Sequence, residues 1–149
     1  IEGAEIEIIG LDTRYFRSKL KGKKNAYKQN KDYEATILGQ DQWIWLESSI
    51  SNSSADIIVI LSSIQILATN HPYEKWNNFP LERKRLLKLI ADAAKKSTII
   101  AISGDRHKSG IYKNKNFVIK IKIFKFFIIL FGKIKMSPCA TSCFCFREV

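Results

Sequence analysis

The chain has 149 residues, of which 46 % are hydrophobic and 26 % are charged, enough for a packed core in one domain or part of one. Its net charge of +11 is unevenly placed: residues 113–149 hold a net of +7, and residues 1–112 hold 17 basic and 13 acidic residues, a net of +4. The first segment is therefore only mildly basic, which suits a phosphate-bearing substrate as well as a nucleic acid.

The first third of the chain predicts a strand, a long loop and a helix. Residues 5–11 (EIEIIGL) predict a strand that enters the core, and residues 12–37 predict a loop. Within that loop, residues 19–31 carry six Lys and no regular apolar period. A solvated surface loop is the ordinary interpretation of such a run, and an anion-attracting lid is the alternative.

A helix is predicted over residues 39–50, with Gly39 as its N-cap. Its apolar face has the spacing i, i+3, i+7. The residues on that face are Trp43, Leu46 and Ile50. Residues 56–61 (DIIVIL) form a continuous apolar run bounded by polar residues, which predicts a buried strand.

Residues 62–79 predict a second loop, and residues 80–96 predict the clearest helix. Pro80 suits the first helical position, and Glu82 suits the first turn. The predicted buried face consists of Leu86, Leu87, Ile90 and Ala94. A third strand is predicted over residues 98–102. The resulting order, β-loop-α-β-loop-α-β, predicts an α/β fold whose sheet is covered by helices.

The composition changes at residue 113, and we therefore divide the chain into residues 1–112 and residues 113–149. Residues 113–135 consist almost wholly of Lys, Ile, Phe and Asn, whose codons are AT-rich. This segment is either an edge strand or the translation of non-coding or frame-shifted DNA, and we favour the second interpretation. The three Cys, an odd number, all lie in the last eleven residues, so no disulfide framework or zinc knuckle can be assigned.

The most informative segment follows the third predicted strand. It reads Ser103-Gly104-Asp105-Arg106-His107. A glycine lets the chain turn sharply after a strand, and the carboxyl ends of strands are where open α/β folds place their chemistry. Asp105 and His107, two positions apart, are therefore candidate ligands of a divalent metal. A turn carboxylate beside a solvent-exposed histidine is the alternative.

Several segments in order resemble the alkaline phosphatase D family of calcineurin-like metallophosphoesterases. The segments are LDTRYFRS at 11–18, LG at 38–39, QW at 42–43, WL at 45–46, SSIQ at 62–65, EKW at 74–76, NFP at 78–80, ER at 82–83 and SGDRH at 103–107. Each is weak alone. The combination, spanning about residues 5–110, is specific.

The resemblance implies a four-layer αββα sandwich with a metal cluster at the strand ends. It implies hydrolysis of phosphate mono- and diesters by a metal-activated water. The expected cofactors are divalent or trivalent metals of the Fe, Ca, Zn or Mn type. The expected partner is a phosphate-ester substrate, with no specific nucleic acid. Oligomeric state and compartment stay open, although family members are often secreted or membrane-associated.

Carried over by residue, the resemblance makes Asp105 and His107 catalytic metal ligands, with Asp105 alternatively orienting a ligand or water. Arg14 and Arg17 flank an aromatic pair and can clamp phosphate, or else pair with a carboxylate such as Asp12.

Gln65 can bind phosphate or water, or alternatively serve packing or a loop hydrogen bond. His71 is expected in a surface or substrate loop. The three Trp are expected as core or loop anchors. Glu74 and Glu82 are expected to pair with Arg83, Arg85 or Lys75.

The chain also departs from the family. The family's upstream ligand motifs, an early Asp, a Gly-Asp pair and an Asp- or His-containing turn, have no match in residues 1–104. We therefore expect a carboxyl-terminal part of a phosphoesterase domain that is inactive alone. The alternatives are a non-catalytic remnant or a basic anion- or nucleic-acid-binding module. No signal peptide is visible at Ile1-Glu2-Gly3, and no apolar run in the tail approaches the ~20 residues that span a bilayer.

Overall fold

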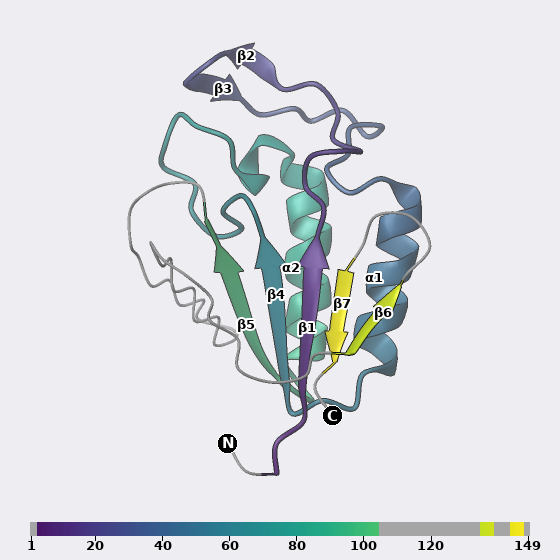
Figure 1. The fold of residues 1–149 in the computed structure, drawn as a ribbon. Helices are drawn as coiled ribbons and strands as arrows, with labels where there is room; N and C mark the ends of the chain where they lie inside the picture. Colours follow the sequence, from purple (N-terminus) through teal and green to yellow (C-terminus); the bar gives the residue numbers. More distant parts are fainter. Residues whose placement is uncertain (1–2, 105–134, 139–143, 148–149) are drawn as a thin grey trace.

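A five-stranded sheet forms the centre of the molecule (Figure 1). The computed structural model describes residues 3–104 and the backbone of two short strands, residues 135–138 and 144–147. The strand order is β5–β4–β1–β7–β6. The parallel strands are β1 (Ile6–Leu11), β4 (Ile57–Ser62) and β5 (Thr98–Ser103), and the antiparallel additions are β7 (Phe144–Arg147) and β6 (Lys135–Pro138).

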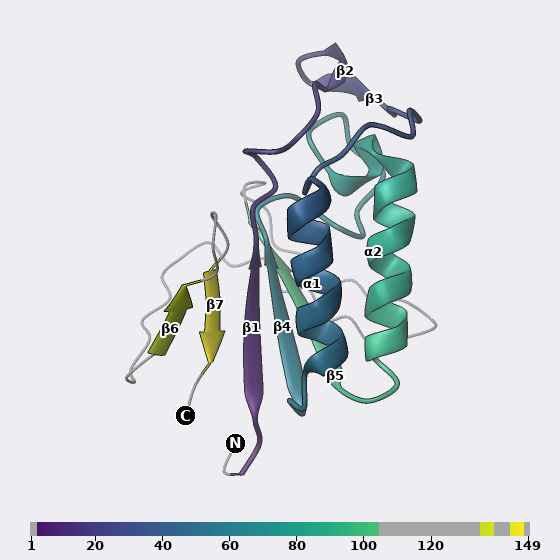
Figure 2. The same ribbon diagram turned by 90° about the vertical axis from the view of Figure 1, so that its right-hand side faces the viewer.

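Two helices connect the parallel strands. Helix α1 (Gln40–Asn52) links β1 to β4, and helix α2 (Pro80–Ala93) links β4 to β5. Both connections step in the same direction across the sheet, and crossovers of one hand then place their helices on one face. The edge-on view shows both helices on the same side (Figure 2). The mixed α/β class with a parallel sheet and two covering helices is thereby confirmed.

The helix-covered face carries the core. Ile9 pairs in register with Ile60, and Ile60 pairs with Ala101. All three side chains are at most 1 % exposed. Alternate residues of a strand point to opposite faces, so this row faces the helices and packs with the buried side chains of α1 and α2 in one cluster.

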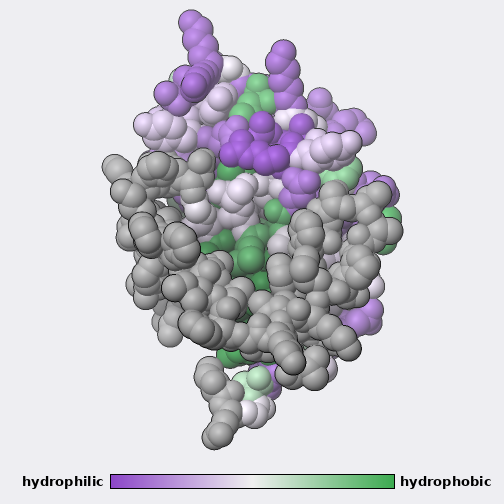
Figure 3. All heavy atoms as spheres, viewed as in Figure 1, coloured by the Kyte–Doolittle hydropathy of each residue, from purple (hydrophilic) through white to green (hydrophobic). Residues whose placement is uncertain are grey.

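The opposite face of the sheet is also apolar but less covered. Ile8, Val59 and Ile100 lie in one register row and are only half-buried. Ile102, at the end of β5, is 38 % exposed. Apolar surface is visible at the middle of this face, below a hydrophilic cap (Figure 3). Strands that are apolar on both faces are typical of sheets covered on both sides.

Helix α1 begins where the sequence predicts, after Gly39. That residue has φ +74°, and a Cβ there would lie 3.0 to 3.3 Å from the Phe16 side chain. The positive φ therefore favours glycine, and a larger residue would also require the Phe16 side chain to shift. The predicted apolar face is confirmed, because Trp43, Leu46 and Ile50 are all buried.

Helix α2 starts at Pro80 as predicted but ends at Ala93, three residues earlier than expected. Leu86 and Ile90 are buried, while Leu87 and Ala94 pack at the edge of the core. None of the helices among the described residues is long and apolar enough to cross a bilayer.

The first predicted loop contains a β-hairpin, which is a correction to the expected order. Strands β2 (Lys21–Lys23) and β3 (Ala26–Lys28) pair in antiparallel fashion across Lys24 and Asn25. Gly22 has φ +94°, and a Cβ there would approach the Ala26 carbonyl oxygen to 2.7 Å. Lysines alternating with Gly and Ala give no apolar periodicity, so the pattern could not reveal these strands.

The segment 113–149 contributes β6 and β7 to the sheet edge beside β1. Residue 8 of β1 pairs with residue 146, and residue 9 pairs with residue 145. The boundary at residue 113, and the interpretation of residues 113–135, remain predictions, because the latter lie almost entirely outside the described part of the chain.

Candidate functional site

A shallow depression of about 280 Å³ lies at the carboxyl ends of the three parallel strands. Because parallel strands end at one edge, their last residues meet there. The lining residues are Gly10, Leu11, Leu61, Ser62, Ser63, Ile102, Ser103 and Gly104. Two glycines and three serines leave room close to the backbone, which suits a small polar group rather than a large apolar ligand.

Three hydroxyl groups of this edge have defined roles. Ser62 donates to the Ile64 carbonyl at 2.8 Å and accepts from Trp76 Nε1 at 3.0 Å. The Ser63 hydroxyl lies 2.5 Å from that of Thr13, which joins the loops after β4 and β1.

Ser103 differs from the other hydroxyls of the site. It is 4 % exposed, and its Oγ has no hydrogen-bond partner among the described residues. A buried hydroxyl left unpaired costs about 1–3 kcal/mol, so Ser103 is available to a ligand at this edge. Its place at the head of the SGDRH segment was the sequence signal, but only Asp105 and His107 were singled out from that segment.

Gln65 contacts the end of β5, at the edge of the sheet that carries the depression. Its side chain is 3 % exposed, and Nε2 donates to the Gly104 carbonyl oxygen at 3.1 Å. The amide thus holds the residue directly before Asp105. Its predicted role in binding phosphate remains a prediction, and the geometry shows a backbone-positioning contact.

Arg14 and Arg17 share one carboxylate. Arg14 Nη1 lies 2.6 Å from Glu74 Oε2, and Arg17 Nη1 lies 2.8 Å from Glu74 Oε1. The alternative role, pairing with a carboxylate, is seen here with Glu74. Asp12, the carboxylate named as an example, accepts the backbone N–H groups of Arg14 and Tyr15 through Oδ1. Glu74 therefore ties the loop after β1 to the loop after β4, and both predicted phosphate clamps already hold a carboxylate.

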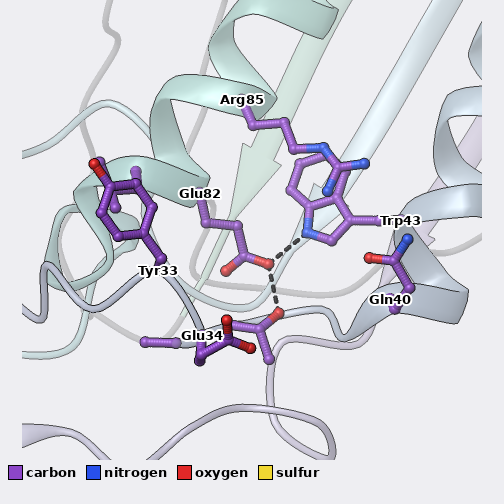
Figure 4. A pocket seen from close by; sticks show the side chains of 9 residues that line it. Tyr33, Glu34, Gln40, Trp43, Glu82 and Arg85 are labelled. Carbon is purple, nitrogen blue, oxygen red and sulfur yellow. Dashed lines mark hydrogen bonds between the residues drawn. The ribbon is translucent and has the colours of Figure 1, made fainter.

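Glu82 is a buried acceptor, 8 % exposed, rather than the partner of a nearby cation (Figure 4). It accepts hydrogen bonds from Thr36 Oγ1 at 2.7 Å, from Trp43 Nε1 at 2.5 Å, and from the backbone N–H groups of Ile37 and Leu38. The expectation that Glu82 pairs with Arg83, Arg85 or Lys75 is wrong.

The basic residues expected beside Glu82 have other partners. Arg83 donates to the carbonyl oxygens of Ile66 and Leu67 at 2.7 and 3.2 Å, and burial lowers the pKa of its guanidinium below the ordinary arginine value. The Arg85 guanidinium lies 4.3 Å from the centre of the Trp43 ring and 2.8 Å from Glu47.

A second cavity of about 350 Å³ lies in front of Glu82, between the amino ends of the two helices. Its buried carboxylate is saturated by four donors from the chain itself. The cavity therefore opens onto a carboxylate whose hydrogen bonds hold residues 36–38 in place, and we assign it no ligand. Trp43 and Trp76 are 2 % and 0 % exposed, and Trp45 packs against the core, so their role as anchors is confirmed.

The predicted metal ligands Asp105 and His107 fall outside the residues that the structure describes. His71 lies half-buried in the loop after β4, with its ring 6.1 Å from that of Tyr73. Within residues 3–104, no three His, Cys, Asp or Glu side chains come together to hold a metal ion. The depression offers hydroxyl groups but no carboxylate or imidazole, so the described residues do not by themselves fit a metal.

Comparison with known proteins agrees with the resemblance. The family model described as PhoD-like phosphatase matches residues 2–124. Alkaline phosphatase D of Bacillus subtilis (strain 168) is 24 % identical over 110 residues, which cover 66 % of this chain and 19 % of that protein. A solved structure described as "Structure of PhoD" has a TM-score of 0.55 at 24 % identity, covering 70 % of this chain and 22 % of that one.

The chain therefore spans about a fifth of the length of these relatives. The structural likeness supports the fold, and the family model covers most of the sequence. The chain belongs to the PhoD-like phosphatase family.

Proposed function

We propose that this chain forms the part of a phosphoesterase that ends the parallel sheet and presents the last metal-binding motif. The reaction is hydrolysis of phosphate mono- or diesters by a metal-activated water, as in the family it belongs to. The observation that carries the proposal is the depression at the carboxyl ends of β1, β4 and β5, from which residues 105–107 continue directly.

The described residues support substrate binding at this edge. The unpaired Ser103 hydroxyl can donate to a phosphoryl oxygen, and the glycines let that oxygen approach the backbone. Arg14 and Arg17 share the single carboxylate of Glu74, so this group of three side chains keeps a net positive charge in the loops after β1 and β4. None of these groups can activate water, so the chemistry needs ligands beyond them.

Asp105 and His107 are the proposed ligands, since a carboxylate and an imidazole suit Zn, Fe or Mn. Two residues cannot hold two metal ions, which in such sites lie ~3.5–4 Å apart. We therefore propose that the remaining ligands come from sequence other than these 149 residues, and that the isolated chain does not hydrolyse phosphate esters. The short coverage of its relatives supports this proposal.

The proposal includes a four-layer sandwich. The row of Ile8, Val59 and Ile100 on the face without helices supports it, because a second sheet would cover these half-buried side chains. Burial of that row would also explain why every parallel strand is apolar on both faces.

The test compares two polypeptides. The 149-residue chain and the protein translated from the complete transcript are each incubated with p-nitrophenyl phosphate and bis-p-nitrophenyl phosphate, with Zn²⁺, Mn²⁺, Fe³⁺ or Ca²⁺. We expect hydrolysis by the complete protein, and its loss in Asp105→Ala and His107→Ala. Ser54→Ala, an exposed position at the opposite end of the sheet, serves as the matched control.

Three outcomes contradict the proposal. Hydrolysis by the isolated chain would show that the upstream ligands are not needed. A complete protein that is inactive with every metal and substrate would favour the non-catalytic remnant. Full activity in both variants would remove Asp105 and His107 from the site.

A further inference from the structure

The positive charge of the first 112 residues is concentrated in one segment. Residues 12–37 carry eight basic and three acidic residues, a net of +5, whereas the remainder of residues 1–112 has a net of −1. Most of that charge belongs to the lysine hairpin, which we define as β2, β3 and their flanks, residues 19–31. Its lysines are Lys19, Lys21, Lys23, Lys24, Lys28 and Lys31.

All six lysines are exposed, and none pairs with a carboxylate among the residues that the structure describes. Lys21 stands directly opposite Lys28 in the register of the hairpin. Like charges in that position destabilise a strand pair. Lys23, two residues from Lys21, projects from the same face. An anion lying along this face would contact three ammonium groups and relieve their repulsion.

The hairpin is held at the active edge of the fold. The Tyr27 backbone N–H donates to the Pro72 carbonyl at 3.1 Å, and the Asn30 N–H donates to the Asn78 carbonyl at 2.6 Å. Both acceptors belong to the loop that follows β4, whose first residues line the depression. Both ribbon views place the hairpin beyond the carboxyl ends of the parallel strands (Figures 1 and 2), and the space-filling view shows hydrophilic side chains at that end (Figure 3).

The chemistry of the hairpin selects among anionic partners. Its one aromatic side chain, Tyr27, is half-buried, so the hairpin has no exposed ring on which a base could stack. It also has no large exposed apolar side chain to enter a bilayer. The cleft at its base, lined by Lys19, Lys21, Asp32 and Glu34 among others, mixes both signs of charge and is not itself an anion site.

We propose that the lysine hairpin binds a linear polyanion of phosphate groups and guides it toward the depression at the strand ends. This rests on the proposed function, and it specifies the substrate class as a chain of phosphates rather than a lone small ester. The attraction is electrostatic and long-ranged, so it raises the local concentration of the polyanion at the depression beyond the strand ends.

Binding can be measured without hydrolysis, which keeps this test separate from that of the proposed function. The 149-residue chain is titrated with fluorescently labelled inorganic polyphosphate at several salt concentrations, and anisotropy gives the affinity. The hairpin variant is Lys21→Gln, Lys23→Gln, Lys28→Gln. The control variant is Lys84→Gln, Lys88→Gln, Lys96→Gln, which removes the same charge from exposed positions elsewhere.

We expect the hairpin variant to lower the slope of log affinity against log salt by about 2, since each phosphate contact contributes ~0.7 for a single strand. If the parent and the hairpin variant bind equally at 1 M salt, this difference in slope makes the variant roughly 50-fold weaker than the parent at 0.15 M salt. The control variant should change affinity much less. Unchanged circular dichroism in both variants verifies that these exposed substitutions leave the fold intact.

Other outcomes overturn the proposal. Equal weakening in both variants would mean that only net charge matters. Hairpin-dependent binding to phosphatidylglycerol vesicles but not to polyphosphate would make the partner a membrane surface. Tighter binding to a single-stranded oligonucleotide than to polyphosphate with the same number of phosphates would make it a nucleic acid.

Discussion

Replacing Glu82 should destabilise the chain more than replacing any exposed carboxylate. Its side chain accepts four hydrogen bonds, two of them from the fully buried backbone N–H groups of Ile37 and Leu38. Glu82→Ala leaves these donors, Trp43 Nε1 and the Thr36 hydroxyl without their acceptor. Each buried donor without a partner costs about 1–3 kcal/mol.

The expected loss is smaller than the sum of four such penalties. The cavity beside Glu82 can admit water to part of the vacated space, so we expect Glu82→Ala to lower the free energy of unfolding by about 3–5 kcal/mol. Glu82→Gln keeps one acceptor oxygen but turns an NH₂ group toward a backbone N–H, so its cost should be about 1–3 kcal/mol.

Urea unfolding followed by tryptophan fluorescence measures both values from the midpoints at constant m-value. The matched control is Glu47→Gln, which removes an exposed ion pair with Arg85 and should cost less than about 1 kcal/mol. If the Glu82→Ala protein does not fold, the free energy of unfolding of Glu82→Gln can still be measured. A Glu82→Ala protein within about 1 kcal/mol of the parent would refute the assignment of this carboxylate as the anchor of residues 36–38.

Two further predictions concern single contacts. Gln65→Leu removes the hydrogen bond to the Gly104 carbonyl. The rate of amide hydrogen exchange at residues 103 and 104 should therefore rise by about tenfold, which corresponds to a hydrogen bond of ~1–1.5 kcal/mol. Unchanged exchange rates would mean that Gln65 does not hold the strand end. The hydrogen bond and positive charge of Lys95 lower the pKa of Asp92 below its ordinary 3.8. Stability from this pair is present above the unfolded pKa and is lost as pH falls through the lower folded value. Lys95→Ala should return the Asp92 pKa toward 3.8 in an NMR titration, and an unmoved pKa would contradict the assigned cause.

The regular elements followed from local patterns. Continuous apolar runs located β1, β4 and β5 to within a residue or two at each end, because these strands are apolar on both faces. The spacing of Trp43, Leu46 and Ile50, with Gly39 before them, located α1. The apolar runs, the helical spacing and the preceding glycine are each local features of a short segment, so they can be recognised in a single sequence.

The partners of the buried and ion-paired side chains could not be predicted from the sequence, because the topology of the fold decides which distant segments meet. Glu74 pairs with Arg14, sixty residues earlier, and Glu82 accepts from residues 39 to 46 positions earlier. Nearby cations were the natural expectation, yet helix α2 turns Glu82 inward toward the loop before α1. The lysine run at residues 19–31 was recognised, but its two strands were not predicted, since these three-residue strands carry no apolar alternation and are fixed by hydrogen bonds to the backbone of the loop after β4.

The most direct test of the central claim is the metal content of the complete protein. Protein purified from the full transcript, its His107→Ala variant and the Ser54→Ala control are dialysed against limiting Mn²⁺ or Zn²⁺, and bound metal is counted by mass spectrometry. We predict that the parent and the control retain metal and that His107→Ala loses at least one ion per chain. Equal metal content in all three proteins would contradict the assignment of this strand end as the metal-binding edge of a PhoD-like phosphatase.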